Sequence, residues 1–472
     1  MARRHSDTSP PARSRAPDAL AADALAAARR GDLATLGRLE RDVLTLASLT
    51  PPGDESVDVP VQAIVVAYVR HAAYDRALAF ARQYASLAGY DRLAGSELLL
   101  LLAAGDHDAA RRLAEEAADA PVAFGGHGLR AIVRTLLGRD ADAASDGAAF
   151  ILEAIETGRS LGAWRTAARL YGPATAQVLS RYAALHRELA EAFPASRPWN
   201  GESLDGRTVA LQLVEGLGDQ LQGLRFARAI RDAGGRVLVG CDDRLRELVR
   251  ASDLAEGFLD RPLPARPDVG PVDFHLVVGG WLHDSGLPSD RWPSAPYLAP
   301  ADTDQPPAIL DGLTRPRIGI AWAGNPDFAL ESTRGLPYAA LRRLVAATPD
   351  VVWVSLQRFD HPRARELGAT PITRRVVDAG PTLRSMLDTA HLMRHLDLVV
   401  ATDSAPAHLA GALGVPVWTL LGPTFNWRWR IDGETTPLYP SMRLIREAAP
   451  GSWNAAVDRV VHDLAAMTPR RA

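Results

Sequence analysis

The spacing of hydrophobic residues changes once along the chain, near residue 200. Between about residues 18 and 193, apolar residues recur every three or four positions, and Ala, Leu, Arg and Glu dominate. That spacing is typical of amphipathic helices. After residue 207, short apolar runs of strand length alternate with helical stretches, which is typical of a parallel sheet with crossover helices. The pattern predicts an α-helical region followed by α/β sequence.

Several helices of the first half are predicted to begin at short turns that contain Asp or Arg, most of them followed closely by Ala. These turns lie at residues 31–32, 74–77, 105–109 and 138–141. From Tyr74 onward they recur at roughly the period of tetratricopeptide repeats, which stack helix pairs into an array with a concave face for a partner protein. Because the large aromatic residues of that repeat are mostly missing, a tetratricopeptide-like array and an irregular helical bundle both stay open.

The α/β sequence divides into two lobes in tandem, with Pro-rich sequence between them. The expected strands lie at 208–214, 237–240 and 274–278, then at 318–323, 351–355, 398–401, 416–421 and 443–445. The expected helices lie at 220–233, 245–250, 338–347, 383–394, about 406–413 and 453–467. The division that we expect is a disordered tail over 1–17, the helical region over 18–193, a linker over 194–206, a first lobe over 207–300 and a second lobe over 315–472. Two facing lobes would bring the loops at their strand ends to one crevice.

Composition narrows the class of protein. The 472 residues are 47% hydrophobic and 23% charged, which is ordinary for a soluble protein of several domains. A formal net charge of -3 argues against a general nucleic-acid binder, although the chain holds 53 Lys and Arg residues. The single Cys241 excludes an internal disulfide and suits a reducing compartment. With no signal-peptide pattern and no apolar run of transmembrane length, we expect a cytoplasmic protein.

The loop after the first strand of the first lobe is Gly216-Leu217-Gly218-Asp219. Its glycines would let a ligand approach the backbone closely, and Asp219 would lie near a helix N-terminus. The dinucleotide-binding fingerprint is incomplete, because Leu221 stands where its third Gly is required. A helix N-cap, for which Asp is a preferred residue, is an equally open interpretation of Asp219.

Two loops of the second lobe also carry polar side chains. Arg334 lies between Thr333 and Gly335 in a loop after a strand, and its planar guanidinium could hold a phosphate. Gln357 and Arg358 follow the next predicted strand. For each of these side chains the alternative is a loop residue that contacts only water.

The stretch from Asp397 to Thr424 is organised as strand, turn, helix and strand. The turn Thr402-Asp403-Ser404 precedes a helix whose N-terminus offers free N–H groups and the positive end of the helix dipole, a natural diphosphate site. His408, inside that helix, is more often a packed core residue than an acid or base. The chain has no metal-ligand spacing, nucleophile elbow or P-loop, which argues against hydrolases and kinases.

These motifs together resemble a known family. Residues 205–470 are similar to bacterial GT-B glycosyltransferases of family 9, the heptosyltransferase type, and in particular to members in which a tetratricopeptide-like region comes first. The resemblance rests on residues 216–219, 318–325, 355–357, 397–399, 403–414, 427–429 and 439–443. It implies an α-helical array followed by two Rossmann-like lobes.

The resemblance also implies an activity and a site. The activity is transfer of a sugar, a hexose or heptose, from a nucleotide-diphosphate donor to a hydroxyl of a glycan or protein, with inversion and without a metal or a cofactor other than the donor. Asp219 corresponds to the general base. The donor-binding residues that it implies are Gly218, Asn325, Arg334, Gln357, Asp403, Ser404, His408, Gly422 and Thr424. Arg334 stands where heptosyltransferases have Lys, and Gln357 falls near a position where they use an acidic residue, so the donor stays open.

Two rival functions remain at this point. One is a non-catalytic scaffold, in which the helical region binds a partner protein and the GT-B part senses a nucleotide sugar. The other is a different GT-B enzyme such as a nucleotide-sugar epimerase, although its pattern of histidines and carboxylates is not evident.

Overall fold

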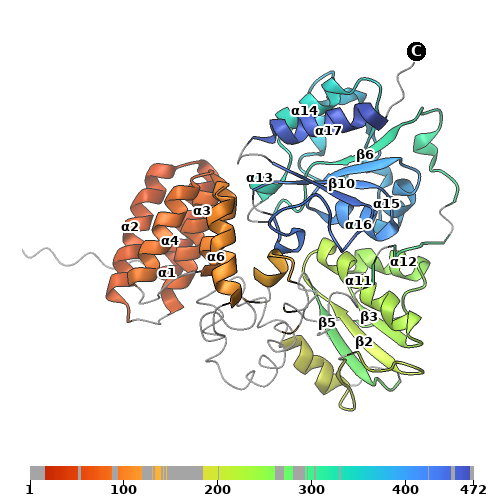
Figure 1. The fold of residues 1–472 in the computed structure, drawn as a ribbon, viewed down its shortest axis with the longest axis horizontal. Helices are drawn as coiled ribbons and strands as arrows, with labels where there is room; N and C mark the ends of the chain where they lie inside the picture. Colours follow the sequence, from red (N-terminus) through yellow and green to blue (C-terminus); the bar gives the residue numbers. More distant parts are fainter. Residues whose placement is uncertain are drawn as a thin grey trace, which may run out of the picture.

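The computed structural model contains a helical region and two α/β lobes (Figure 1). It describes residues 16–51, 55–87, 94–119, 130, 133–139, 142, 145, 184–199, 201–260, 270–279, 293–294, 296–301, 304–328, 331–423, 425–447 and 452–467. Both lobes are built on parallel sheets with crossover helices. The predicted fold class, a helical region followed by a GT-B arrangement of two Rossmann-like lobes, is confirmed.

The helical region consists of successive helices that pack against their neighbours in the chain. Their bounds are α1 Pro17–Arg30, α2 Leu33–Leu49, α3 Asp58–Arg70, α4 Tyr74–Leu87, α5 Ala94–Ala104 and α6 His107–Asp119. The turn between α1 and α2 follows from two residues: Gly31 takes φ +70° at the end of α1, and the Asp32 carboxylate accepts the Thr35 N–H at 2.9 Å. Helices α2 and α6 begin at the turns predicted at 31–32 and 105–109, whereas 74–77 form the first turn of α4 and the turn itself lies at 71–73; 140–141 of the fourth turn lie outside the described residues. The tetratricopeptide identity stays a prediction.

The first lobe has a five-stranded parallel sheet in the order β1-β5-β2-β3-β4. Its strands are β1 Arg197–Pro198, β2 Thr208–Leu213, β3 Arg236–Gly240, β4 Gly257–Phe258 and β5 Phe274–Val278, and its helices are α11 Leu217–Asp232 and α12 Asp243–Ala251. All residues of β2 and β5 are buried, as expected for central strands covered on both faces. The predicted strands of this lobe are confirmed to within one residue.

The sequence on either side of residue 194 contributes to the first lobe. Residues 194–206, expected as a linker, contain β1, which pairs in parallel with β5. A helix over residues 184–192 also packs on the sheet, because its Leu185 and Leu189 share a buried cluster with Val277. The apolar spacing predicted this helix correctly, but spacing alone does not identify the surface that a helix covers.

The second lobe has a six-stranded parallel sheet in the order β11-β10-β9-β6-β7-β8. Its strands are β6 Arg317–Ala321, β7 Val352–Ser355, β8 Val377–Asp378, β9 Leu398–Thr402, β10 Val417–Leu421 and β11 Met442–Arg446. Its helices are α13 Glu331–Arg334, α14 Tyr338–Ala347, α15 Met386–Met393, α16 Ala405–Leu413 and α17 Trp453–Met467. Both α14 and α17 begin and end at the predicted residues. Figure 1 shows these two helices together on the side of the sheet away from the first lobe.

The lobes meet through helices, with α11 against α16 and α12 against α15 (Figure 1). Tyr297, from the segment that connects the lobes, donates its hydroxyl to the Leu221 carbonyl at 3.0 Å. Arg225 of α11 lies 5.2 Å from the ring centres of both Tyr297 and Tyr439. Its guanidinium donates to the Leu438 carbonyl at 3.2 Å. The meeting of the lobes is therefore a packed interface around a buried, hydrogen-bonded arginine.

A buried pair of histidines joins the helix over 184–192 to β5. The ring centres of His186 and His275 are 5.5 Å apart, and the Ser196 hydroxyl lies 2.9 Å from His275 Nδ1. Burial lowers the pKa of His186 to about 3 and that of His275 to about 4. Both imidazoles are therefore neutral in the folded protein at neutral pH.

This pair predicts a loss of stability in mild acid. An unfolded histidine binds its proton near pH 6.5, whereas the folded pair resists protonation until the pH approaches 4. The unfolded state therefore takes up more protons as the pH falls below 6.5, and stability is lost toward the folded pKa values. We expect the free energy of unfolding to fall by roughly 1–2 kcal/mol per histidine between pH 7 and 5. Denaturant unfolding of His186→Phe should show a shallower slope with pH, and an unchanged slope would contradict the assignment.

Candidate active site

The loop after β2 places Asp219 in the first turn of α11. Gly216 is the N-cap, so α11 begins three residues earlier than predicted, and the interpretation of Asp219 as the N-cap is wrong. Instead, Asp219 Oδ2 reaches back and accepts the Gly216 N–H at 3.1 Å. This is the third helical position, from which an acidic side chain caps the helix start. A helix start within Gly-Leu-Gly is hard to predict, since glycine is a poor helix former.

The other carboxylate oxygen of Asp219 is bound by an arginine of the second lobe. Arg428 Nη2 donates to Asp219 Oδ1 at 2.5 Å, and Arg428 Nη1 donates to Gln222 Oε1 at 2.7 Å. Arg428 lies in a 3₁₀ turn, Trp427–Trp429, and is 5% exposed. The candidate base therefore sits where the two lobes touch, and both of its oxygens accept hydrogen bonds.

The turn after β9 leads into α16 as predicted. Ser404 is the N-cap, but its hydroxyl donates to the Thr402 carbonyl at 3.0 Å and forms no bond to the start of the helix. Pro406 lies in the first turn, and Gly414 ends the helix with φ +74°. The N-terminus of α16 thus has no side-chain cap, and its N–H groups and positive dipole end stay available to an anion.

Gly218 lets the starts of α11 and α16 approach each other. A Cβ at this position would lie 2.8 Å from His408 Cδ2 and 3.6 Å from the Ala405 nitrogen. Any larger residue would have to displace a buried ring. The glycine of the Gly-Asp pair thus brings the two helix N-termini side by side, and with them the candidate base and the turn after β9.

His408 is packed between the lobes. Its Nδ1 lies 2.9 Å from the Tyr439 hydroxyl, and its ring centre lies 5.3 Å from that of Trp429. Its Nε2 is 3.8 Å from Asp403 Oδ1. These contacts hold the ring beside Asp403 and agree with the interpretation of His408 as a packed core residue.

Three arginine side chains act on the buried His408 ring. Burial is the main cause that lowers the pKa of His408 well below its ordinary value, and the charges of Arg428, Arg225 and Arg334 lower it further. Three arginines from different segments therefore act on the same buried ring, next to two helix N-termini. Such an arrangement favours a bound anion.

Arg334 lies at the end of α13, a short helix where a loop was expected. Its guanidinium donates to Glu331 Oε2 at 2.9 Å from Nε and 2.6 Å from Nη2, and it lies 4.5 Å from the ring centre of Phe328. The Arg334 side chain is 17% exposed. A phosphate at this position would have to replace Glu331 as the partner of the guanidinium.

Gly422, at the end of β10, packs against the backbone of α13. A Cβ there would lie 2.3 Å from the Thr333 carbonyl oxygen. Gly422 is therefore needed for the close approach that sets the position of Arg334. Thr424, predicted to line the same site, lies outside the described residues.

Replacing Gly422 by alanine should disturb both stability and the Arg334 segment. The new methyl group meets backbone rather than a flexible side chain, so α13 has to shift, at a cost of roughly 1–3 kcal/mol. Gly368→Ala is a matched control, because no atom lies within 4 Å of its Cβ. Thermal unfolding should show a lower midpoint for Gly422→Ala only, and equal midpoints would contradict this packing.

Gln357 and Asn325 occupy neighbouring loops. Gln357 is buried, and its Oε1 accepts the Ala323 N–H at 3.2 Å, which joins the loops after β6 and β7. Asn325 is exposed, and its Oδ1 accepts the Asp327 N–H at 3.1 Å. The described bond of Asn325 thus stays within its own turn, and that of Gln357 supports the loop that leads toward Arg334.

Four residues at the site were missed from the sequence: Gln222, Glu331, Arg428 and Tyr439. Arg428, Tyr439 and Glu331 bind the predicted residues Asp219, His408 and Arg334, and Gln222 accepts a hydrogen bond from Arg428. Arg428 had a signal, because an arginine flanked by two tryptophans is an unusual surface sequence. Glu331 had one as well, since it lies three residues before Arg334, the spacing of an ion pair on a helix.

In the described ranges, no group of three or more His, Cys, Asp or Glu side chains is arranged to hold a metal ion. No helix among them has the length and apolar character to cross a membrane. Burial raises the pKa of the Cys241 thiol to about 12, so this cysteine is a poor nucleophile at neutral pH.

Comparison with known proteins gives a family match in the second lobe. Residues 379–452, which include the turn after β9, α16 and Arg428, match the model of glycosyltransferase family 9 (heptosyltransferase). Protein FlbA of Caulobacter vibrioides is 26% identical over 285 residues, which cover 56% of this chain and 47% of FlbA. The chain therefore spans about half the length of this curated relative.

Solved structures with a similar fold include a heptosyltransferase and a family 9 glycosyl transferase. Heptosyltransferase II of E. coli, titled an ADP-heptose LPS heptosyltransferase, is 15% identical with a TM-score of 0.40, over 55% of this chain and 98% of that one. The family 9 glycosyl transferase of Veillonella parvula is 13% identical with a TM-score of 0.39, over 53% and 88%. The GT-B arrangement is present in the structure as two lobes, each built on a parallel sheet. Residues 379–452 of the second lobe are therefore similar to glycosyltransferase family 9 (heptosyltransferase).

Proposed function

We propose that this protein transfers a sugar from a nucleotide-diphosphate donor to a hydroxyl group of a glycan or protein. The observation that carries the proposal is the close approach of the N-termini of α11 and α16 at Gly218, beside the carboxylates of Asp219 and Asp403. A donor of this kind carries two negative phosphates, which helix N-termini and arginines bind well. The family 9 match covers the α16 half of this region.

On the donor side, the diphosphate lies at the N-terminus of α16. The diphosphate accepts hydrogen bonds from the backbone N–H groups that follow Ser404 at the start of the helix. Asp403 accepts hydrogen bonds from sugar hydroxyls. Arg334 leaves Glu331 and donates to a phosphate oxygen instead. The full donor-binding set in this proposal is Gly218, Asn325, Arg334, Gln357, Asp403, Ser404, His408, Gly422 and Thr424. The sugar is a hexose or heptose, and no metal or further cofactor enters the reaction.

On the acceptor side, Asp219 is the general base. As the acceptor oxygen forms its bond to the anomeric carbon, Asp219 takes the hydroxyl proton, and the bond from that carbon to the phosphate oxygen breaks. Attack from the face opposite the diphosphate inverts the anomeric centre. The departing diphosphate keeps the electron pair, and its charge is neutralised by Arg334 and the start of α16.

A non-catalytic function is the second candidate, and a specific observation favours it. Both charged groups that the reaction needs are engaged inside the protein, Asp219 by Arg428 and Arg334 by Glu331. A protein that only senses a nucleotide sugar, and binds a partner through its helical region, would need neither group free. Turnover is the property that separates the two candidates.

A thermal-shift panel tests the proposal. The full chain is heated with nucleotide-diphosphate sugars that differ in base and sugar, and a donor that binds the folded state raises the midpoint by mass action. We expect one donor to give the largest shift and then to be turned over. Binding without turnover would favour the sensor, and a panel with no shift would contradict nucleotide-sugar binding altogether.

A further inference from the structure

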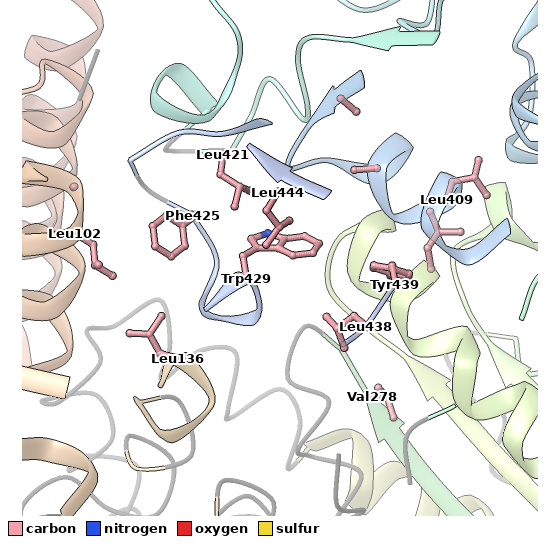
Figure 2. Packing of buried hydrophobic residues seen from close by; sticks show 14 of the residues in the cluster. Leu102, Leu136, Val278, Leu409, Leu421, Phe425, Trp429, Leu438, Tyr439 and Leu444 are labelled. Atoms are coloured by element: carbon pink, nitrogen blue, oxygen red, sulfur yellow. The ribbon is translucent and has the colours of Figure 1, made fainter. Parts of the chain in front are cut away.

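The helical region touches the second lobe at the two segments that carry arginines of the candidate site. Helix α3 contacts α13, which ends in Arg334. The second segment is residues 425–432, here called the strap, which carries Arg428 and lies beside the helical region (Figure 2). Neither contact was predicted, because each joins residues far apart in the sequence.

The outer side of the strap is bound to the helical region by polar contacts. The Ile431 N–H donates to the Leu136 carbonyl at 3.1 Å. Asp432 forms an ion pair with Arg111 of α6. Because both side chains of this ion pair are exposed, it adds little stability by itself, and the backbone bond is the more specific contact.

Apolar packing strengthens the same junction. Figure 2 shows Leu102 and Leu136 of the helical region facing Phe425 of the strap. These residues and Ile431 are buried and belong to one continuous hydrophobic cluster. Burial of side chains of this size contributes more than the exposed ion pair, so the strap is held mainly by its apolar contacts.

The inner side of the strap faces the candidate site. Trp429 is fully buried and stacks near His408, and its carbonyl accepts a hydrogen bond from Arg446 at 2.5 Å. Arg428 donates to Asp219 and Gln222 of the first lobe. One short segment is therefore bonded to the helical region on one side and to the candidate base on the other.

Arg428 has the geometry of a residue that orients a carboxylate. With two bonds across the lobes and almost no exposure, its guanidinium has few alternative positions. A hydrogen bond weakens steeply as its length and angle depart from the ideal, so a shift of the strap would turn the Asp219 carboxylate. Misplacement of a reacting group by about 1 Å can cost on the order of 10²-fold in rate.

We infer that the helical region contributes to the active site. Its contacts with residues 425–432, here called the brace, hold the strap in place. Arg428 of the strap is then the positioning residue that orients the Asp219 carboxylate toward the acceptor. The inference rests on the proposed function for the role of Asp219. The brace itself, however, is a physical coupling between Leu136 and Arg428 that exists whether or not the protein is an enzyme.

The brace is tested with a matched pair of variants. Leu136→Ala removes apolar contact at the strap, whereas Leu36→Ala removes a buried leucine from α2, which packs within the helical region. Both should lower the thermal midpoint, but only Leu136→Ala should lower kcat, by at least about fivefold. Equal loss of kcat in the two variants would overturn the brace, since it would then reflect general destabilisation.

The role of Arg428 is tested by a split between kcat and binding. Arg428→Met should lower kcat at least about tenfold while the Kd for the nucleoside diphosphate stays within about twofold, and Arg428→Lys should restore part of kcat. A Kd that weakens in step with kcat would make Arg428 a donor-binding residue instead. An unchanged kcat would also overturn the positioning role.

If the wild-type protein turns over no donor, the proposed function is refuted but the brace is not. The thermal stability of the variants then tests the brace. In a double-mutant cycle, Leu136→Ala and Arg428→Met should change the thermal midpoint non-additively, because both act on the strap. Leu36→Ala with Arg428→Met should be additive, as expected for distant sites. Additivity in both cycles would overturn the brace.

Discussion

Asp219→Asn is expected to abolish sugar transfer while nucleotide binding stays intact. The substitution keeps the shape of the side chain and removes its ability to take a proton, which for a general base lowers kcat by about 10²–10⁴-fold. The donor lies against α16, Arg334 and Asp403 in this account, so its Kd, measured by calorimetry, should change little. A variant that keeps its kcat would remove Asp219 from the role of base.

The ion pair between Asp219 and the buried Arg428 also affects the stability of the Asp219→Asn variant. Arg428 is buried and pairs with Asp219, so Asp219→Asn leaves a buried charge without its partner, at a cost of about 3–5 kcal/mol. Asp219→Asn combined with Arg428→Met removes both charges and should recover much of the thermal midpoint without recovering activity. Asp232→Asn, an exposed carboxylate on the same helix, serves as a control and should alter neither property.

Arg334→Met is expected to weaken nucleoside-diphosphate binding by about 10–100-fold. Hydrogen bonds to charged groups contribute about 1.5–3 kcal/mol, and the planar guanidinium offers two of them to a phosphate. In the free protein the same guanidinium pairs with Glu331, so the single variant leaves a carboxylate beside the phosphate. That like charge adds to the loss.

A second variant separates the two effects. Arg334→Met with Glu331→Gln removes the repulsion and should bind more tightly than Arg334→Met alone, yet more weakly than the wild type. Arg343→Met is the matched control, because Arg343 forms an exposed ion pair with Asp458 on the outer helices of the lobe. Calorimetry that finds the same Kd for Arg334→Met and the wild type would exclude a phosphate role for this arginine.

Local structure could be predicted from the sequence where a single segment determines it. The apolar runs of β5 and β9, the helix α14 and the glycine that ends α16 all follow from patterns within a few residues. β1 could not be predicted, because it is two residues long, includes Pro198 and exists only through pairing with β5. Such a strand is a product of tertiary structure.

The same limit applies to the candidate site. The predicted positions of Asp219 and Ser404 at helix starts follow from local sequence, and the structure brings these two starts together through Gly218. Arg428 reaches Asp219 from 209 positions away. A contact at that separation leaves no periodicity in the sequence, so its partner could not be identified. From the sequence, Arg428 was therefore recognisable only as part of residues 427–429, one of the segments that carry the family resemblance.

The role of the helical region could not be predicted from the sequence either, because its contacts with the second lobe join residues far apart in the chain. Helical spacing predicts an array with a surface for a partner protein, but it gives no preferred partner. In the structure, part of the surface of the helical region is in contact with the strap and with α13. A partner that binds the helical region would therefore act next to the segments that carry Arg334 and Arg428.

The central claim is that a nucleotide-diphosphate sugar bound at α16 is attacked by an acceptor that Asp219 deprotonates. The most direct measurement is release of nucleoside diphosphate from the donor chosen by the thermal-shift panel, for the wild type and Asp219→Asn at equal occupancy of donor. We predict equal donor Kd values, with release by the wild type at least about 10²-fold faster. Equal Kd values with equal release rates would contradict the account.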